Sequence, residues 1–275
     1  MAKQIITVLC EGPHDVAFIT KILKTIRFKS NENVKLVNYP HPINELLEKE
    51  VTKTNVGELN LQEVRQALLP SNALIRGDDY LFLYSMGGDS KRISRQQILD
   101  KLKQNMPKES GEITEFLMKD TILSLIYILD ADNKGVEKRL EDLNKEIKEV
   151  IGEEPFEIDR KIKTSNKIKF GSFIFTGANG NTGKLEDILM PLMQKNNEEI
   201  FENAQKYLSD NFDETRVKKN NYDKSKSMIG VAGQLQKSGS SNVVCIGQTD
   251  YLTDEKIHSD IKCQEIIAFF EDFLA

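Results

Sequence analysis

The sequence has few cysteines and no long apolar run, and these two shortages exclude several classes of protein. Its three cysteines, Cys10, Cys245 and Cys263, are odd in number, widely separated and never in a C-x-x-C pair. Neither a disulfide framework nor a zinc ribbon is therefore indicated, and reduced, packed thiols are expected. The apolar run 122–129 is far shorter than the ~20 residues that span a bilayer.

The N-terminus also lacks a basic region followed by an apolar stretch, which is the pattern that begins a signal peptide. We therefore expect a cytoplasmic protein with no membrane segment. What the chain does have is 275 residues, 39% of them hydrophobic and 29% charged. This is enough for one large folded domain or two small ones.

Charge is distributed unevenly along the chain. The net charge of −5 argues against a surface that is basic throughout, but two stretches are basic. Residues 160–169 hold five Lys/Arg and no acid, and residues 216–237 hold six Lys/Arg against the single acid Asp223. Each stretch is either a solvated surface or a surface that binds a polyanion along its length.

A strand followed by a helix recurs four times. The strands are expected at 4–10, 80–84, 124–129 and 171–175, and the helices at 14–28, 94–103, 136–150 and 185–193. This alternation predicts an α/β fold with a mostly parallel central sheet and helices on both faces. Ligands bind such sheets outside the carboxyl ends of the strands.

The remaining segments elaborate this core. Residues 40–79 form an insertion with one helical stretch near Leu61–Leu69, and the core extends over 1–193. Residues 194–275 form a C-terminal α/β extension packed on the core. Its helices are expected at 198–208, 224–236 and 260–274, and a strand at 243–246.

Carboxylates stand at two of the expected strand ends. Glu11 directly follows the first strand, Asp15 begins the next helix, and Asp130 and Asp132 end the strand at 124–129. The D-x-D spacing would project both aspartates to one side of an extended strand. If the two strands are neighbours, the four carboxylates converge, and they then favour Mg²⁺, Mn²⁺ or Ca²⁺.

The order of these motifs resembles the TOPRIM domain of topoisomerases, bacterial primases, small ribonuclease-maturation enzymes and OLD-family nucleases. The motifs are strand-Glu11-Gly12-x-x-Asp15-helix, strand-Gly87-Gly88 and Ile128-Leu129-Asp130-Ala131-Asp132-Asn133. With Gly183-Lys184-Leu185-Glu186-Asp187 and Lys224-Ser225-Lys226, the chain looks like stand-alone, DUF3226-type TOPRIM proteins related to OLD nucleases. The resemblance covers most of the chain except about 40–79, and it implies a Rossmann-like TOPRIM fold.

The resemblance also implies roles for particular residues. Glu11 matches the glutamate of the first strand, Asp15 the aspartate after it, and Asp130 and Asp132 the paired metal-binding aspartates. Glu186 matches an acid that serves a second metal. The metal set implied is thus Glu11, Asp15, Asp130, Asp132 and Glu186, with Mg²⁺ or Mn²⁺ as the cofactor.

The resemblance further implies a downstream lysine, Lys226 or its neighbour Lys224. In the expected reaction Glu11 is a metal ligand or general base, and Lys226 stabilises charge on the phosphate. Lys218, Lys219, Lys224 and Lys226 would contact nucleic acid. We therefore expect a Mg²⁺/Mn²⁺-dependent nuclease-like enzyme that cleaves phosphodiesters in DNA or RNA.

The chain departs from the larger relatives in one respect. It contains no G-x-x-x-x-G-K-[ST], so the resemblance to OLD nucleases stops at their catalytic half. A homodimer and a partner ATPase are further expectations. The alternative function is a metal- and nucleic-acid-binding module without turnover of its own, which works with a partner protein. A small-molecule phosphohydrolase is disfavoured because its D-x-D would lie on the first strand.

Two smaller features are open to more than one interpretation. The glycine-rich loop 177–183 either cradles a phosphate or positions Glu186. His14 lies between Glu11 and Asp15 and either faces solvent or approaches the metal.

Overall fold

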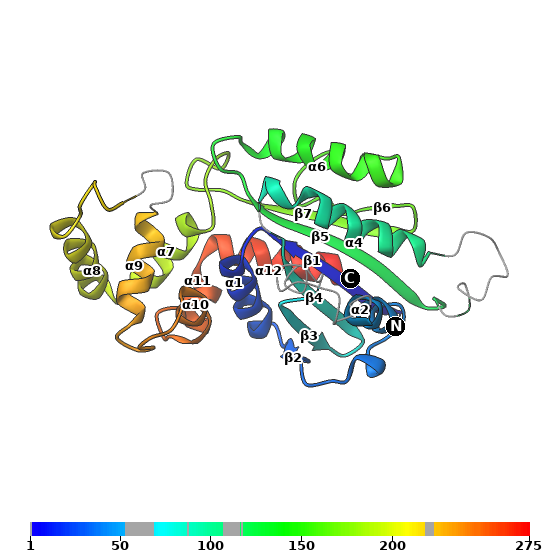
Figure 1. The fold of residues 1–275 in the computed structure, drawn as a ribbon, viewed down its shortest axis with the longest axis horizontal. Coiled ribbons are helices and arrows are strands. Elements are labelled where there is room, and N and C mark those ends of the chain that lie inside the picture. Colours follow the sequence, from blue (N-terminus) through cyan, green and yellow to red (C-terminus); the bar gives the residue numbers. More distant parts are fainter. Residues whose placement is uncertain (1, 53–68, 87, 107–115, 117, 218–222) are drawn as a thin grey trace.

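The protein folds around a seven-stranded sheet, as its computed structural model shows (Figure 1). The structure describes residues 2–52, 69–86, 88–106, 116, 118–217 and 223–275. The strand order is β2-β3-β4-β1-β5-β7-β6. The strands are β1 (Lys3–Cys10), β2 (Lys29–Ser30), β3 (Asn72–Arg76), β4 (Asp79–Ser85), β5 (Thr121–Asp130), β6 (Lys163–Ser165) and β7 (Ile168–Phe175).

The centre of the sheet is parallel. β1 pairs in parallel with both β4 and β5, and β5 pairs in parallel with β7. β3 and β6 add antiparallel strands at the two sides. The expected mixed α/β fold with a mostly parallel central sheet is thus confirmed, and the carboxyl ends of β4, β1, β5 and β7 meet at one edge.

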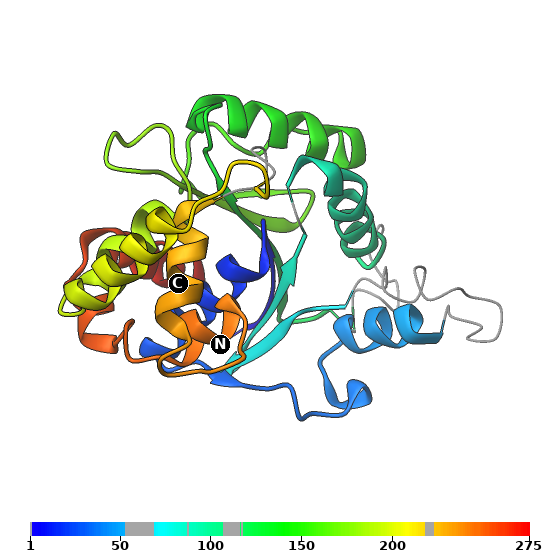
Figure 2. The ribbon, with the colours of Figure 1, turned by 60° about the vertical axis from the view of Figure 1, so that its left-hand side comes forward.

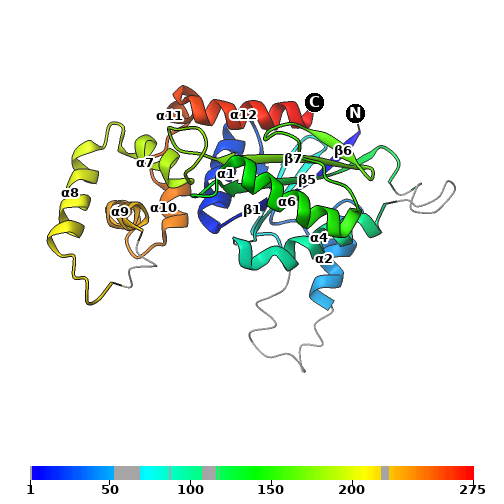
Figure 3. The same cartoon turned by 90° about the horizontal axis from the view of Figure 1, so that it is seen from above.

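Ten α-helices are described. They are α1 (Pro13–Thr25), α2 (Ile43–Thr52), α4 (Arg92–Gln104), α6 (Val136–Ile151), α7 (Glu186–Gln194), α8 (Glu198–Asp210), α9 (Lys224–Gly233), α10 (Asn242–Gln248), α11 (Asp254–Ser259) and α12 (Ile261–Leu274). Helices α1 and α12 cover one face of the sheet, and α2, α4 and α6 cover the other (Figures 1 and 3). Among the described residues, no helix is long and apolar enough to cross a membrane.

Side chains that alternate between the two faces of the sheet form a hydrophobic core on each face. Ile6 and Val8 of β1 face the core shared with α1, α7 and α12, whereas Ile5 and Leu9 face the core shared with α2, α4 and α6. Successive side chains of a strand point to opposite faces, so an almost continuous apolar run is buried on both sides. Each of the three cysteines is buried and free, as the sequence predicted.

Helices α7 to α11 form a lobe at one end of the sheet, and Figure 2 brings α8 and α9 of this lobe to the front (yellow and orange). From the lobe the chain returns along the sheet as α12. Close packing of α12 on β7 depends on Gly171. A Cβ at this position would lie 2.8 Å from Cε2 of Phe273 and 2.9 Å from Cζ of Phe269.

One expected element is wrong. Residues 243–246 belong to helix α10, not to a strand. The apolar run is short enough to fit either structure, and packing decides: the Cys245 side chain fills the space that a Cβ on Gly233 of α9 would need. The described part of the extension therefore contains helices and loops but no strand.

The insertion at 40–79 contains more structure than the sequence indicated. Its described part includes α2 and the strand β3, which pairs with β4. Of the helical stretch expected near Leu61–Leu69, residues 61–68 lie outside the described residues.

Candidate functional site

Four carboxylates gather at the carboxyl edge of the sheet. Glu11 follows β1, and Asp130 ends the neighbouring strand β5. Asp15 lies in the first turn of α1, and Glu186 is the first residue of α7. The fold thus brings together residues that are up to 175 positions apart in the chain, and we call them the carboxylate cluster.

Backbone N–H groups orient three members of the cluster. The amide of Asp130 donates to Glu11 Oε2 at 3.1 Å, and the amide of Gly12 donates to Asp15 Oδ2 at 2.8 Å. The amide of Leu185 donates to Asp130 Oδ1 at 2.8 Å. Because each donor belongs to a strand end or helix start, the carboxylates are held by rigid elements.

The carboxylates also interact through their charges. Burial, reinforced by the charges of Glu11 and Glu186 and partly offset by backbone hydrogen bonds, raises the pKa of Asp15 to about 7. Burial, and then the charges of Asp15 and Glu11, raises the pKa of Asp130 to about 8. Carboxylates that raise each other's pKa through their charges must lie close to one another.

Two oxygens of the cluster are buried without a hydrogen-bond donor among the described residues. They are Asp15 Oδ1 and Glu186 Oε2. For Glu186 Oε2, Lys184 Nζ at 3.9 Å supplies the nearby charge. A buried carboxylate oxygen without a donor is costly unless a proton or a cation satisfies it.

Two side chains with basic nitrogens lie next to Glu186. His14 Nδ1 and Lys226 Nζ each lie 3.4 Å from Glu186 Oε1. Burial would raise the pKa of Glu186, but the His14 hydrogen bond and the charges of Lys226 and Lys184 prevail and lower it. Glu186 is therefore charged, and His14 approaches the cluster rather than solvent.

The lysines expected downstream differ in where the structure places them. Lys226 on α9 reaches Glu186, whereas Lys224 is an exposed residue at the start of the same helix. Lys218 and Lys219 lie outside the described residues. Of the two candidate lysines, the fold places Lys226 at the carboxylate cluster.

Asp132 is oriented differently from Asp130. The expectation that both D-x-D carboxylates project together from an extended strand is wrong, because β5 ends at Asp130 and Asp132 has a φ of +48°. Instead, Arg139 Nη2 donates to Asp132 Oδ2 at 2.6 Å, and Arg139 Nε donates to the Asp130 carbonyl at 2.8 Å. The role of Asp132 as a metal ligand stays a prediction.

The loop 177–183 links these parts of the site. Its last residue, Gly183, exchanges two backbone hydrogen bonds with Asp132, at 2.7 and 3.0 Å. The loop is also closed on itself, since Gly177 N donates to Thr182 O at 2.8 Å. These bonds fix the loop to Asp132, and both interpretations of the loop, phosphate binding and positioning of Glu186, stay predictions.

The carboxylate oxygens of the cluster are the ligands that hard cations prefer, but they do not surround a single point. In the part of the chain that the structure describes, no group of three His, Cys, Asp or Glu side chains could hold a metal ion as it stands. The oxygens without donors on Asp15 and Glu186 nevertheless fit Mg²⁺ or Mn²⁺, which prefer carboxylate oxygens. Glu11, Asp15, Asp130 and Glu186 are the residues that would hold it.

Sequence reasoning missed the roles of Arg139, Lys184 and Asp223. Lys184 pairs with Asp223, which is the N-cap of α9 and thereby sets the position of Lys226. The one available signal was the placement of Lys184 two residues before Glu186. Arg139 had none, because it lies in a helix whose charges resemble an ordinary solvated face.

The fold and the cluster define a mixed α/β protein with an acidic site at the carboxyl edge of its sheet. The chain belongs to the family described as "Protein of unknown function (DUF3226)", whose model matches residues 6–275. A crystal structure of the hypothetical protein PH0156 from Pyrococcus horikoshii OT3 has a similar fold, with a TM-score of 0.53 and 13% sequence identity. The match covers 98% of this chain and 95% of that chain. No curated protein matches the chain.

Proposed function

We propose that the chain is a TOPRIM-type, divalent-metal-dependent phosphodiesterase that acts on DNA or RNA in the cytoplasm. The observation that carries the proposal is the proximity of four carboxylates: Glu11 and Asp130 at the carboxyl ends of two adjacent parallel strands, and Asp15 and Glu186 at the starts of two helices beside them. The order of the motifs and their resemblance to OLD-type nucleases support it.

Bound Mg²⁺ or Mn²⁺ would lower the pKa of a bound water and offset the negative charge of an in-line displacement at phosphorus. Within the chain, Asp130 and Asp15 would bind the cation, and Glu186 would extend the site toward a second ion. Glu11 accepts a hydrogen bond from the Asp130 amide, which orients its carboxylate as a ligand or base. Lys226, about half exposed beside Glu186, could contact a phosphate oxygen.

Cleavage assays with a matched pair of variants test the proposal. Asp130→Asn removes a cluster charge, whereas Asp120→Asn changes an aspartate at the opposite end of β5 whose φ of +58° asparagine tolerates. With single- and double-stranded DNA and RNA and Mg²⁺ or Mn²⁺, we expect wild-type and Asp120→Asn chains to cleave alike. Asp130→Asn should lose at least ~100-fold in rate, and EDTA should abolish cleavage.

A second candidate function rests on the Arg139–Asp132 pair. Because Arg139 holds the Asp132 carboxylate, that side chain is not free to complete a metal site in this conformation. This observation favours a metal- and nucleic-acid-binding module that acquires turnover only with a partner protein, such as an ATPase or a second copy of the chain.

Calorimetric titration with Mn²⁺, beside the cleavage assay, separates the two candidates. Mn²⁺ binding that Asp130→Asn abolishes, together with no cleavage, would favour the binding module. Absence of both Mn²⁺ binding and cleavage in the wild-type chain would overturn both candidates.

A further inference from the structure

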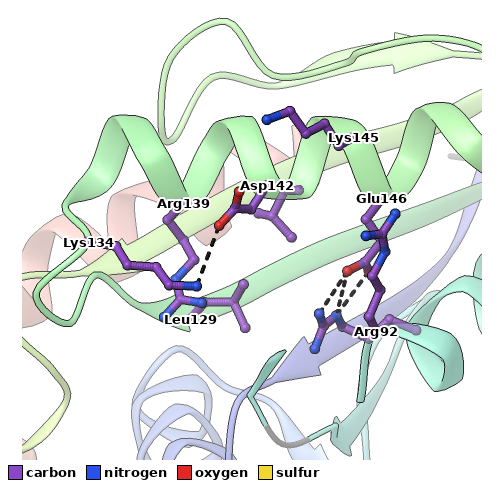
Figure 4. Close-up of a pocket in the computed structure, with 9 residues that line it drawn as sticks. Arg92, Leu129, Lys134, Arg139, Asp142, Lys145 and Glu146 are labelled. Carbon is purple, nitrogen blue, oxygen red and sulfur yellow. Dashed lines mark hydrogen bonds and ion pairs between the residues drawn. The ribbon is translucent and has the colours of Figure 1, made fainter. Parts of the chain in front are cut away.

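A recess lies on the α4/α6 side of the carboxylate cluster. Its volume is ≈ 290 Å³, and its walls come from α4, α6, the end of β5 and the loop that follows (Figure 4). We call it the α4/α6 cavity. At ~30 Å³ per water it has room for about ten waters, so a phosphate group with part of its hydration shell fits.

The walls are rich in cations. Arg92, Arg95, Lys134, Arg139 and Lys145 line the cavity, and among the described residues the acids that line it are Asp142 and Glu146. Positive charges therefore outnumber negative ones in the lining itself, while Glu149 and Asp132 pair with Arg92 and Arg139 from outside it. Such an excess attracts an anion and partly offsets the repulsion from the neighbouring carboxylates.

The cavity is joined to the carboxylate cluster at two points. Arg139 lines the cavity and donates both to Asp132 and to the carbonyl of Asp130. Arg95 lines it as well and donates to the carbonyl of Gly88 at 2.8 Å. A Cβ on Gly88 would lie 3.4 Å from Glu11 Oε1, so Gly88 borders the cluster. An anion in the cavity therefore lies beside the proposed reaction site.

The cations differ in how firmly they are held. Arg95 forms a buried pair with Glu146, 2.7 Å between Nη2 and Oε2, and this pair is a fixed part of the wall. Arg92 pairs with Glu149, and Lys134 pairs with Asp142 at 3.5 Å. The last two pairs are partly exposed to solvent, with side-chain exposures of 37–59%, so each is worth little and gives way to an incoming anion at small cost.

We propose that the α4/α6 cavity binds a backbone phosphate of the polynucleotide substrate, next to the phosphate that reacts at the carboxylate cluster. This inference rests on the proposed function and names the surface that holds its substrate. Arg92 and Lys134 contact the phosphate. Arg139 connects it to the reaction site, and the Arg95–Glu146 pair supports the wall.

Binding in EDTA tests the cavity without requiring cleavage. The full-length chain is titrated with a fluorescein-labelled single-stranded DNA at several NaCl concentrations. For the double variant Arg92→Gln/Lys134→Gln, loss of two phosphate contacts should flatten the slope of log K against log [NaCl] by about 1.4. At ~0.1 M salt this slope change corresponds to about 25-fold weaker binding.

The matched control is Arg27→Gln/Lys148→Gln, which removes the same charge. Arg27 follows the far end of α1, and Lys148 lies one turn along α6 from Lys145; both are exposed and outside the cavity. The control should keep the wild-type slope. Both double variants should keep the circular dichroism spectrum of the folded chain.

Two results would overturn the assignment. Equal slopes in the two double variants would show that the cavity holds no backbone phosphate. Binding of inorganic phosphate that Arg92→Gln/Lys134→Gln abolishes, without oligonucleotide binding, would assign the cavity to a small free anion. The first result leaves the proposed function standing, whereas a lack of oligonucleotide binding would also count against it. Metal-dependent cleavage, measured in separate assays, distinguishes the two failures.

Discussion

Within the carboxylate cluster, the pKa of Asp130 is raised further than that of Asp15. Its pKa of about 8 arises first from burial and then from the charges of Asp15 and Glu11. In metal-free buffer at pH 9 the side chain is charged in the folded protein and repelled by its neighbours. Asp130→Asn removes that repulsion, and its amide oxygen can still accept from Leu185, so we expect stabilisation of roughly 1–3 kcal/mol.

Urea unfolding in EDTA measures this effect. The gain should shrink as the pH falls and vanish only below about pH 4, where the carboxyl is protonated in both the folded and the unfolded chain. The same substitution should abolish any rise in stability on addition of Mg²⁺ at pH 9. A variant that is destabilised at pH 9 would show that Asp130 is not under repulsion.

Asp15 and Asp130 together set a pH dependence. Their pKa values of about 7 and 8 lie above the ordinary value of 3.8 for an aspartate. Between about pH 4 and pH 8 the folded chain therefore binds more protons than the unfolded chain, and the free energy of unfolding contributed by these groups falls as pH rises. Urea titrations in EDTA across this range should show the fall.

Divalent cations should oppose this loss. A cation that binds charged Asp15 and Asp130 must displace their protons, so its affinity should rise from pH 6 to pH 8. Calorimetry in two buffers of different ionisation enthalpy would detect the released protons. Affinity that does not change over this range would contradict the assignment of these two groups.

Among the elements, the loop 177–183 has the tightest backbone requirement. Gly183 has a φ of +126°, and a Cβ there would lie 2.2 Å from the Gly177 amide nitrogen. Gly183→Ala should cost at least ~2–3 kcal/mol and displace Asp132, to which Gly183 is hydrogen-bonded.

Gly180→Ala is the matched control for this loop. Gly180 also has a positive φ, +70°, but a Cβ there would meet no atom within 4 Å, so the cost should be about 1 kcal/mol. Chemical denaturation of both variants compares them. Equal losses would show that the loop adapts and does not position Asp132.

An element could be predicted from the sequence where its own residues determine its structure, and it could not where contacts with distant residues do. The apolar runs of β1 and β5 are buried on both faces, so their identity and their acidic ends were evident from sequence. The run 243–246 was not decided locally, because its contact with Gly233 places it on a helix. Arg139 had no signal, since nothing in the pattern of its charged helix indicates a contact with Asp132 in the turn before that helix.

At the scale of the whole molecule, one apolar core joins the sheet to the C-terminal helices. The cluster that contains Ile6 of β1 and Ile128 of β5 also contains Ile229 of α9 and Phe270 of α12. The extension therefore shares its core with the carboxylate site, and Lys226 reaches Glu186 from it. Because neither part buries its own apolar surface alone, we expect one cooperative unfolding transition.

Phe270 and Ile261 of α12 provide the test of this shared core. Phe270 is fully buried, so Phe270→Ala should cost about 3–5 kcal/mol, whereas Ile261 is 76% exposed and Ile261→Ala should change stability by less than ~0.5 kcal/mol. Urea unfolding is followed by far-ultraviolet circular dichroism for helices and near-ultraviolet circular dichroism for tyrosines. Both signals should move together in Phe270→Ala, because the core that loses the ring spans the sheet and the extension. Two separate unfolding transitions, of which only one shifts in Phe270→Ala, would instead show that the extension is a domain with a core of its own. Docking of that domain would then bring Lys226 to the site.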